Sequence, residues 1–305
     1  MTGVGERNAL GLPWRLADPP ERDRSSAPAG VIDAHVHVFP PRLAAAVRRW
    51  FDRHAWHLRY RLDAEGIDAF MAARGVDRYL ALHYAHTAGL AEHLNRFALE
   101  FAASHPRCVP CATVLPGEPD AEGILRRALG AGARAVKIHC HVQRLGPDDR
   151  RLDPVYRQVS DRGVLLMIHC GDGPALPGYG FDVQQMCTPA ALERALQRYP
   201  QAKVCVPHLG FSQTPQYLEL LDRYPNLYLD TAMALSGYFD VSYDDELLRR
   251  CSGRILYGTD FPHIPYAWDR DLRAITQARL DDGQRAAILG GNARRLLGLD
   301  RRCEP

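Results

Sequence analysis

Short apolar runs and amphipathic stretches alternate along most of the chain. The short runs are rich in β-branched residues and lack a clean two-residue alternation, which is typical of parallel strands buried on both faces. The predicted strands cover residues 31–38, 76–83, 107–114, 133–139, 164–169, 203–207, 227–230 and 254–257. The predicted helices cover residues 42–52, 64–74, 88–104, 120–129, 154–162, 189–199, 214–223, 243–251, 268–279, 282–289 and 292–297.

This repetition predicts an α/β fold. Eight strand–helix units in one chain of 305 residues favour a (β/α)8 TIM barrel. The alternative is an open, doubly wound sheet, but no Gly-x-Gly-x-x-Gly motif follows the first strand, as a dinucleotide-binding domain would require.

The segments before and after the first predicted strand suggest how the chain is divided into an arm, a domain and an insertion. Residues 1–29 contain Pro13, Pro19, Pro20 and Pro28 and predict an irregular N-terminal arm. Residues 30–300 are predicted to form a single barrel domain. Residues 40–62, between the first strand and the next capped helix, are predicted to be an insertion.

Composition narrows the class of protein. The net charge is +2 without a basic run, which argues against nucleic acid, and no apolar run approaches 18 residues, which argues against a membrane span. No signal peptide is evident, so we expect a cytoplasmic protein whose eight cysteines are reduced.

The first predicted strand carries two histidines, His35 and His37. Residues two apart on a strand share a face, with backbones about 6–7 Å apart, so both imidazoles can converge on one metal ion. Either ring could instead be a hydrogen-bonded core histidine, and this strand alone leaves both interpretations open.

Ionisable groups recur at the carboxyl ends of the other strands, where catalytic groups of a (β/α)8 barrel lie. The residues concerned are Lys137, His139, His169, His208, Asp260 and His263. Packing alone does not explain ionisable groups at the same place in so many strands, so the whole set predicts a metal site.

Six motifs in this order carry a resemblance to a known family: DAHVH (33–37), VKIH (136–139), IHCG (168–171), PHLG (207–210), YGTDFP (257–262) and GNARRLL (291–297). Together they resemble the amidohydrolase superfamily, and more closely its branch of metal-dependent hydrolases and non-oxidative decarboxylases. The resemblance covers residues 31–298 and implies a distorted (β/α)8 barrel with a divalent metal ion at its mouth.

The resemblance also implies roles for individual residues. His35, His37, His169 and Asp260 match the metal ligands, and His208 matches a histidine that acts beside the metal or binds a second one. Imidazole and carboxylate ligands suit Zn²⁺, with Mn²⁺, Fe²⁺ or Co²⁺ as alternatives. Lys137 matches a lysine that is carboxylated and bridges two metals in some branches, although here one metal is expected; otherwise it would pair with a carboxylate such as Asp33.

Substrate contacts are expected from three further residues. His139 shares a strand face with Lys137 and is predicted to point into the same cavity. Arg59 and Arg61 lie in a basic, aromatic segment after the first strand and could bind an acidic substrate, with Trp56 and Tyr60 as an aromatic wall. The long, Gly- and Pro-rich loop over residues 171–187 is predicted to cover the pocket.

Two reactions fit these expectations. Asp260 and His208 would transfer protons during hydrolysis of an amide, ester or lactone of a small molecule. The same site could instead catalyse non-oxidative decarboxylation of a small carboxylic acid, which could be aromatic. Many members of the branch are dimers, so the resemblance implies a homodimer, although the sequence shows no interface pattern.

Overall fold

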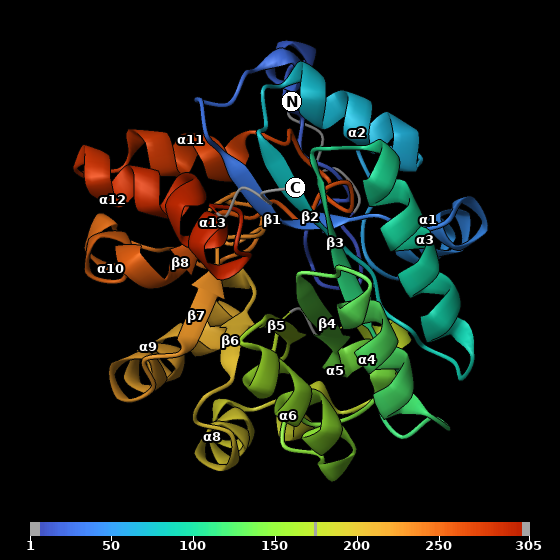
Figure 1. Ribbon diagram of the computed structural model, residues 1–305. Helices are drawn as coiled ribbons and strands as arrows, with labels where there is room; N and C mark the ends of the chain where they lie inside the picture. Colours follow the sequence, from blue (N-terminus) through green and yellow to red (C-terminus); the bar gives the residue numbers. More distant parts are fainter. Residues whose placement is uncertain (1–6, 174–175, 301–305) are drawn as a thin grey trace.

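Eight parallel strands pair in the order in which they occur in the chain (Figure 1). The computed structural model describes residues 7–173 and 176–300. The strands are β1 (Ile32–His37), β2 (Arg78–Leu82), β3 (Cys108–Thr113), β4 (Ala135–His139), β5 (Leu165–His169), β6 (Lys203–Val206), β7 (Leu227–Asp230) and β8 (Ile255–Leu256). The predicted (β/α)8 barrel is therefore confirmed.

Helices surround the strands, as Figure 1 shows. They are α1 (Pro41–His54), α2 (Ala64–Ala73), α3 (Leu90–Ser104), α4 (Ala121–Gly130), α5 (Cys140–Gln143), α6 (Asp153–Arg162), α7 (Val183–Met186), α8 (Pro189–Arg198), α9 (Thr214–Arg223), α10 (Asp245–Arg250), α11 (Arg270–Gln277), α12 (Asp282–Ala286) and α13 (Asn292–Leu296). None of the helices in the described part of the chain is both long enough and apolar enough to cross a membrane.

Backbone hydrogen bonds close the barrel between its last and first strands. The amide of Ala34 donates to the carbonyl of Tyr257 at 2.8 Å, and the amide of His37 donates to that of Phe261 at 2.7 Å. The amide of Asp260 donates to the carbonyl of His35 at 2.9 Å. The closure therefore ties the backbones of three predicted metal-site residues together, although β8 itself has only two residues.

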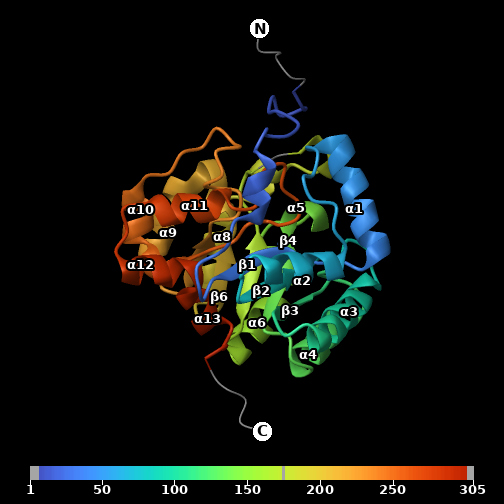
Figure 2. The ribbon, with the colours of Figure 1, turned by 90° about the horizontal axis from the view of Figure 1, so that it is seen from above.

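Alternating residues of each strand enter two separate hydrophobic layers. The inner layer fills the barrel with side chains such as Leu80, Leu165 and Met167, and α13 closes one end with Ala293 and Leu296. The outer layer packs the strands against the helices. Figure 2 shows α13 near one end of the barrel and α5, which follows β4, toward the other.

The helix predicted over residues 282–289 is wrong at its C-terminal end. Helix α12 ends at Ala286, and a π-helical turn, Ala287–Gly291, joins it to α13. A Cβ atom at Gly290 would lie 2.2 Å from the carbonyl oxygen of Gly30. The turn therefore lies against the chain as it enters β1, an approach that only glycine permits.

The chain before β1 packs over the loop that follows β8. The carboxylate of Asp18 accepts hydrogen bonds from the Ala267 amide at 2.8 Å and from Arg270 at 2.7 Å. The amide of Leu16 donates to the carbonyl of Pro265 at 3.0 Å. The division into an arm of residues 1–29, a barrel domain of residues 30–300 and an insertion at 40–62 stays a prediction.

Candidate metal centre

The two histidines of β1 point into the barrel because the strand changes register. Its pairing with β2 shifts between Asp33 and Val36. Ala34 lies in the inner hydrophobic layer, whereas Val36 lies in the outer layer. The side chains that flank Val36 therefore face inward, and the rings of His35 and His37 lie 5.1 Å apart between centroids.

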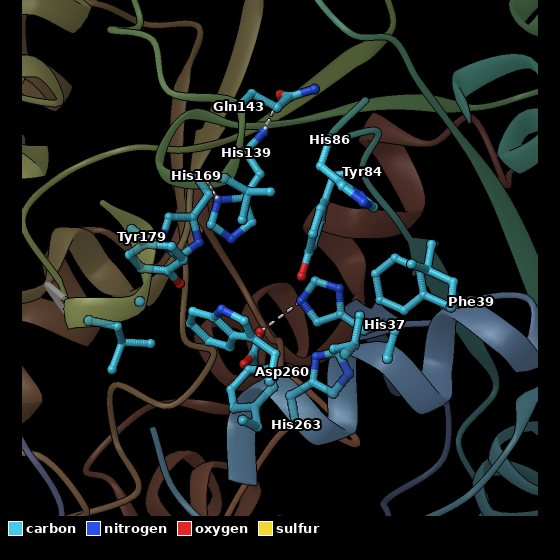
Figure 3. A pocket seen from close by; sticks show the side chains of 18 of the residues that line it. His37, Phe39, Tyr84, His86, His139, Gln143, His169, Tyr179, Asp260 and His263 are labelled. Carbon is cyan, nitrogen blue, oxygen red and sulfur yellow. Dashed lines mark hydrogen bonds and ion pairs between the residues drawn. The ribbon is translucent and has the colours of Figure 1, made fainter. Parts of the chain in front are cut away.

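Asp260 meets both imidazoles from the loop after β8, and Figure 3 shows it beside His37. Its Oδ1 lies 3.1 Å from Nε2 of His35 and 3.1 Å from Nε2 of His37. One ligand atom from each of the three residues falls within 4.8 Å of the other two. Asp260 adopts a left-handed conformation (φ 68°), and its backbone hydrogen bond to His35 holds this uncommon geometry.

Two further histidines come from β5 and from the segment that follows β6. His169 stacks on His139, with ring centroids 4.1 Å apart. Nε2 of His208 lies 3.4 Å from Nδ1 of His169, and its ring centroid lies 5.5 Å from that of His35. The sequence-predicted residues His35, His37, His169, His208 and Asp260 are thus brought together at one end of the barrel.

Asp230, the last residue of β7, is a site residue that the sequence reasoning missed. Its Oδ2 lies 2.8 Å from Nδ1 of His35, and its Oδ1 accepts the amides of His208 and Ala232, each at 3.0 Å. Since a buried carboxylate accepts the Nδ1 proton, Nε2 of His35 carries the lone pair that faces Asp260. The available signal was its place at a predicted strand end, the rule that identified the other residues.

Asp33 is buried next to the same region and does not line the cavity. Its carboxylate accepts hydrogen bonds from the His35 amide at 3.0 Å and from the Thr259 hydroxyl at 2.6 Å. Complete burial raises the pKa of Asp33 to about 7, although these hydrogen bonds lower it. Asp33 therefore fastens β1 to the start of the loop that carries Asp260.

The protonation states at the centre suit metal ligands. Burial opposes ionisation of Asp260, but the adjacent imidazoles of His35 and His37 hold the pKa of its carboxyl well below the usual range. Burial lowers the pKa of His37 to about 4. Burial and the neighbouring histidines keep the pKa of His169 well below its ordinary value. At neutral pH the carboxylate is thus charged, and both imidazoles are neutral with a lone pair available.

Unpartnered polar atoms test whether the residues fit a metal ion. Within the described residues, the buried Nε2 of His169 has no hydrogen-bond partner. A buried imidazole nitrogen without a partner is uncommon, and a bound divalent ion would supply the partner. Imidazole and carboxylate ligands suit Zn²⁺, Mn²⁺ or Fe²⁺, so the converging His35, His37 and Asp260 fit a divalent ion, and His169 as a further ligand stays a prediction.

Lys137 lies beneath this group on β4 and is fully buried. Burial lowers the pKa of its ammonium group, against the attraction of Asp230 and Asp260. Its Nζ makes no hydrogen bond or ion pair with any described residue. The alternative pairing with Asp33 is therefore wrong, and a role for Lys137 as a metal ligand stays a prediction.

A cavity of about 590 Å³ opens above the centre (Figure 3). Aromatic side chains form much of its wall. It is lined by His37, Phe39, Leu43, Ala46, Val47, Trp50, Phe51, Trp56, Tyr84, His86, His139, Val142, Gln143, Arg144, His169, Leu176, Gly178, Tyr179, His208, Met233, Asp260 and His263. Of the residues expected to contact the substrate or to form the aromatic wall, His139 and Trp56 therefore line the cavity.

Gln143 fixes the edge of this cavity. Its amide nitrogen donates to the carbonyls of Ala85 and Val114, at 2.9 and 2.8 Å, and its side-chain oxygen accepts the His139 amide at 2.9 Å. One buried side chain thus joins the segments that follow β2 and β3 to the end of β4. Sequence reasoning missed Gln143 because a glutamine four residues after a strand histidine has no distinctive pattern.

The expectation that Arg59 and Arg61 line the pocket is wrong. Neither residue is among those that line the cavity. The Arg59 guanidinium pairs with Asp23 at 2.9 Å, and that of Arg61 pairs with Asp52 at 2.6 Å. Tyr60, expected as part of the aromatic wall, bonds instead to Asp23. These side chains fasten the segment after α1 to neighbouring surface elements, because intrachain carboxylates lie within reach.

The loop after β5 reaches across the cavity to α1. Tyr179 stacks on Trp50, with ring centroids 5.2 Å apart. Leu176 and Gly178 also line the cavity. The described part of the loop therefore forms one wall of the pocket, as its length and composition predicted; residues 174–175 lie outside the described residues.

None of the cysteines in the described part of the chain lines the cavity. Those in the described residues, Cys108, Cys111, Cys140, Cys170, Cys187, Cys205 and Cys251, are free and buried. His83, the residue after β2, is fully buried.

The fold and these residues define a class: (β/α)8-barrel enzymes with a candidate metal centre at the carboxyl ends of the strands. A family model described as Amidohydrolase matches residues 32–299, which is most of the chain. The chain therefore belongs to this amidohydrolase family, as its motifs indicated. No curated protein matches the chain.

Several solved structures share the fold. An uncharacterised TIM-barrel protein from Bordetella bronchiseptica matches with a TM-score of 0.69 and 20% identity, over 89% of this chain and 99% of its own. The 5-carboxyvanillate decarboxylase of Sphingomonas paucimobilis matches with a TM-score of 0.64 and 19% identity, over 89% and 99%. The 5-carboxyvanillate decarboxylase of Novosphingobium aromaticivorans was solved with manganese and 4-hydroxy-3-methoxy-5-nitrobenzoic acid. It matches with a TM-score of 0.64 and 16% identity, over 91% of this chain and 99% of its own.

Proposed function

We propose that the protein is a metal-dependent hydrolase that cleaves an amide, ester or lactone bond of a small molecule. The observation that carries this proposal is the orientation of His208. Its Nδ1 lies 2.7 Å from the carbonyl oxygen of Ala232. A carbonyl oxygen only accepts, so Nδ1 carries the proton and the bare Nε2 faces the metal centre.

His35, His37, His169 and Asp260 would hold the ion, with Zn²⁺ as the expected metal. When bound, a divalent ion supplies Lewis acidity, which polarises a carbonyl group and makes a water molecule more acidic. His208 would accept the water proton on Nε2 and return it to the leaving group. Asp230 keeps His35 in the tautomer that a ligand needs and also fixes the backbone of His208.

A second candidate is non-oxidative decarboxylation of an aromatic carboxylic acid. The aromatic wall of the cavity favours it, since Phe39, Trp50, Tyr84 and Tyr179 offer flat surfaces to a ring. Two of the similar solved structures are named as decarboxylases of an aromatic acid. We rank it second because Nε2 of His208 is a proton acceptor, whereas carbon protonation after loss of CO₂ requires a donor.

A screen of the zinc- and manganese-loaded protein separates the two reactions. Aryl esters, anilides, lactones and hydroxybenzoic acids are offered in parallel, and acid release and CO₂ release are both recorded. The proposal predicts acid release without CO₂. CO₂ release from a hydroxybenzoic acid, with all esters, amides and lactones inert, would replace hydrolysis by decarboxylation.

The proposal extends to the setting of the enzyme. We propose a small-molecule substrate and a homodimeric cytoplasmic protein that binds neither nucleic acid nor membranes. The near-neutral charge balance supports the last two points.

A further inference from the structure

Arg144 is a cation in the cavity to which the proposed reaction assigns no role. Among the described residues that line the cavity it is the only arginine or lysine, and Asp260 is the only acid. If Asp260 serves as a metal ligand, the charge of Arg144 has no counterpart in the lining.

The guanidinium of Arg144 is free to bind a ligand. It makes no hydrogen bond or ion pair with any residue in the described ranges 7–173 and 176–300, whereas Arg59 and Arg61 both pair with carboxylates. Its side chain is exposed at the rim and passes near Gly180 of the loop after β5. A solvated guanidinium that borders a cavity can exchange water for an anion at little cost in desolvation.

The backbone around Arg144 is held in place by buried neighbours. Arg144 has φ 54° and ψ 55°, a left-handed conformation in which glycine or asparagine is usual at the end of a helix. Its amide donates to the carbonyl of Cys140, and that of Leu145 donates to the same oxygen at 3.2 Å. Gln143, on its other side, is fixed by three hydrogen bonds. The side chain of Arg144 therefore extends from a backbone that is held in place by hydrogen bonds.

The chain places Arg144 on the solvent side of the metal centre. His139 ends β4 near the predicted ligand His169, and the four residues of α5 then carry the chain about 6 Å further before Arg144. Aromatic side chains adjoin His139: Tyr84 lies 4.7 Å and Tyr179 6.2 Å from its ring, between centroids. The cavity thus offers ligands at one end, aromatic surfaces beside them and one positive charge at the rim.

We propose that Arg144 is a specificity-determining residue that binds a carboxylate on the substrate, at the end opposite the bond that reacts. The substrate class is then a flat, aromatic acid derivative with one acyl-type group at the metal centre and one carboxylate at the rim. A carboxylate suits the site better than a phosphate because one guanidinium balances one negative charge. The inference rests on the proposed function for the identity of the reacting group, but the charge preference can be measured without turnover.

Binding and turnover are tested with matched probes on the zinc-loaded protein. Quenching of Trp50 and Trp56 fluorescence, both in the cavity wall, gives the affinities of 4-hydroxybenzoate and of its neutral analogue 4-hydroxybenzamide. Hydrolysis of the anionic ester 4-acetoxybenzoate and of the neutral ester 4-acetoxybenzamide gives two values of kcat/KM, which are compared in the same way. The variants are Arg144→Gln and Arg144→Lys, with Arg150→Gln as a control for lost charge on the same loop, because Arg150 is exposed and does not line the cavity.

The proposal predicts that the wild-type protein prefers each anionic probe over its neutral analogue by about tenfold. Arg144→Gln should abolish this preference without altering the neutral probes more than about twofold, Arg144→Lys should retain part of it, and Arg150→Gln should retain all of it. Two results would overturn the assignment. One is an unchanged preference in Arg144→Gln, as expected if the carboxylate binds only at the metal, and the other is an equal loss of affinity for the anionic and the neutral probe. Failure to hydrolyse either ester counts against ester hydrolysis at the metal centre alone, because the binding comparison still decides the role of Arg144.

Discussion

The substitution Asp230→Asn tests whether the carboxylate behind His35 prepares that residue to bind a metal. Asp230 accepts three hydrogen bonds, from the ring of His35 and from the amides of His208 and Ala232. An asparagine has the same shape but only one accepting oxygen. Either the ring or the two amides must then face an amide NH₂ group.

The expected cost follows from that mismatch. If the NH₂ group faces His35, the ring changes tautomer and its proton moves to Nε2, the atom that faces Asp260. Loss of such a carboxylate behind a ligand typically lowers metal affinity 10- to 100-fold, or about 1.4–2.7 kcal/mol. If the amides lose their acceptor instead, the buried unpaired donors reduce the free energy of unfolding by about 1–3 kcal/mol.

Zinc affinity is measured by competition with a chromophoric chelator, and stability by urea unfolding of the metal-free protein. Asp18→Asn serves as a control because Asp18 is also a buried aspartate that accepts a backbone amide, and it lies outside the cavity lining. It should lower stability and leave zinc affinity within about twofold. Zinc binding by Asp230→Asn within threefold of the wild-type affinity would refute the proposed role of Asp230.

Two further predictions concern the pocket wall and the arm. A Cβ at Gly178 would lie 2.8 Å from Cγ of His54 and 2.9 Å from Cζ2 of Trp50, so Gly178→Ala should push the loop off α1 and raise KM about fivefold, or about 1 kcal/mol. The control variant Gly253→Ala should leave KM unchanged, because a Cβ there meets nothing within 4 Å. Equal KM values for the two variants would contradict the role of the loop. Burial would raise the pKa of Asp18, but pairing with Arg270 and Arg22 lowers it from 3.8 to about 2. Because the folded-state pKa is depressed, its stabilisation is complete above pH 4 and is lost as the pH falls to about 2. Urea midpoints should show that wild type loses about 1–2 kcal/mol more over this range than Asp18→Asn, and parallel curves would exclude the effect.

The barrel and most of the site could be predicted from local sequence patterns. Parallel strands buried on both faces appear as apolar runs, and their carboxyl ends must meet at one mouth. The positions of His169, His208 and Asp260 at predicted strand ends are therefore enough to group them in one site. The inward direction of His35 and His37 additionally depends on a register shift in β1, which a two-residue alternation does not reveal.

Long-range pairing explains what the sequence could not predict. Arg59 and Arg61 appeared available for a substrate because their partners, Asp23 and Asp52, come from other segments. Arg144 was not considered because its place at the rim depends on the short helix α5 and on hydrogen bonds from Gln143 to two other strand ends. The predicted pairing of Lys137 with Asp33 was wrong, since Asp33 is already occupied by Thr259 and the His35 amide.

The metal content of the purified protein tests the central claim most directly. Elemental analysis after reconstitution with zinc and removal of loosely bound ions should find about one divalent metal per chain. His169→Ala should lose most of that metal while circular dichroism still reports a folded barrel, because the residue packs at the mouth rather than within the inner hydrophobic layer. A wild-type protein that retains no transition metal, or a His169→Ala variant that retains as much as the wild type, would contradict the account.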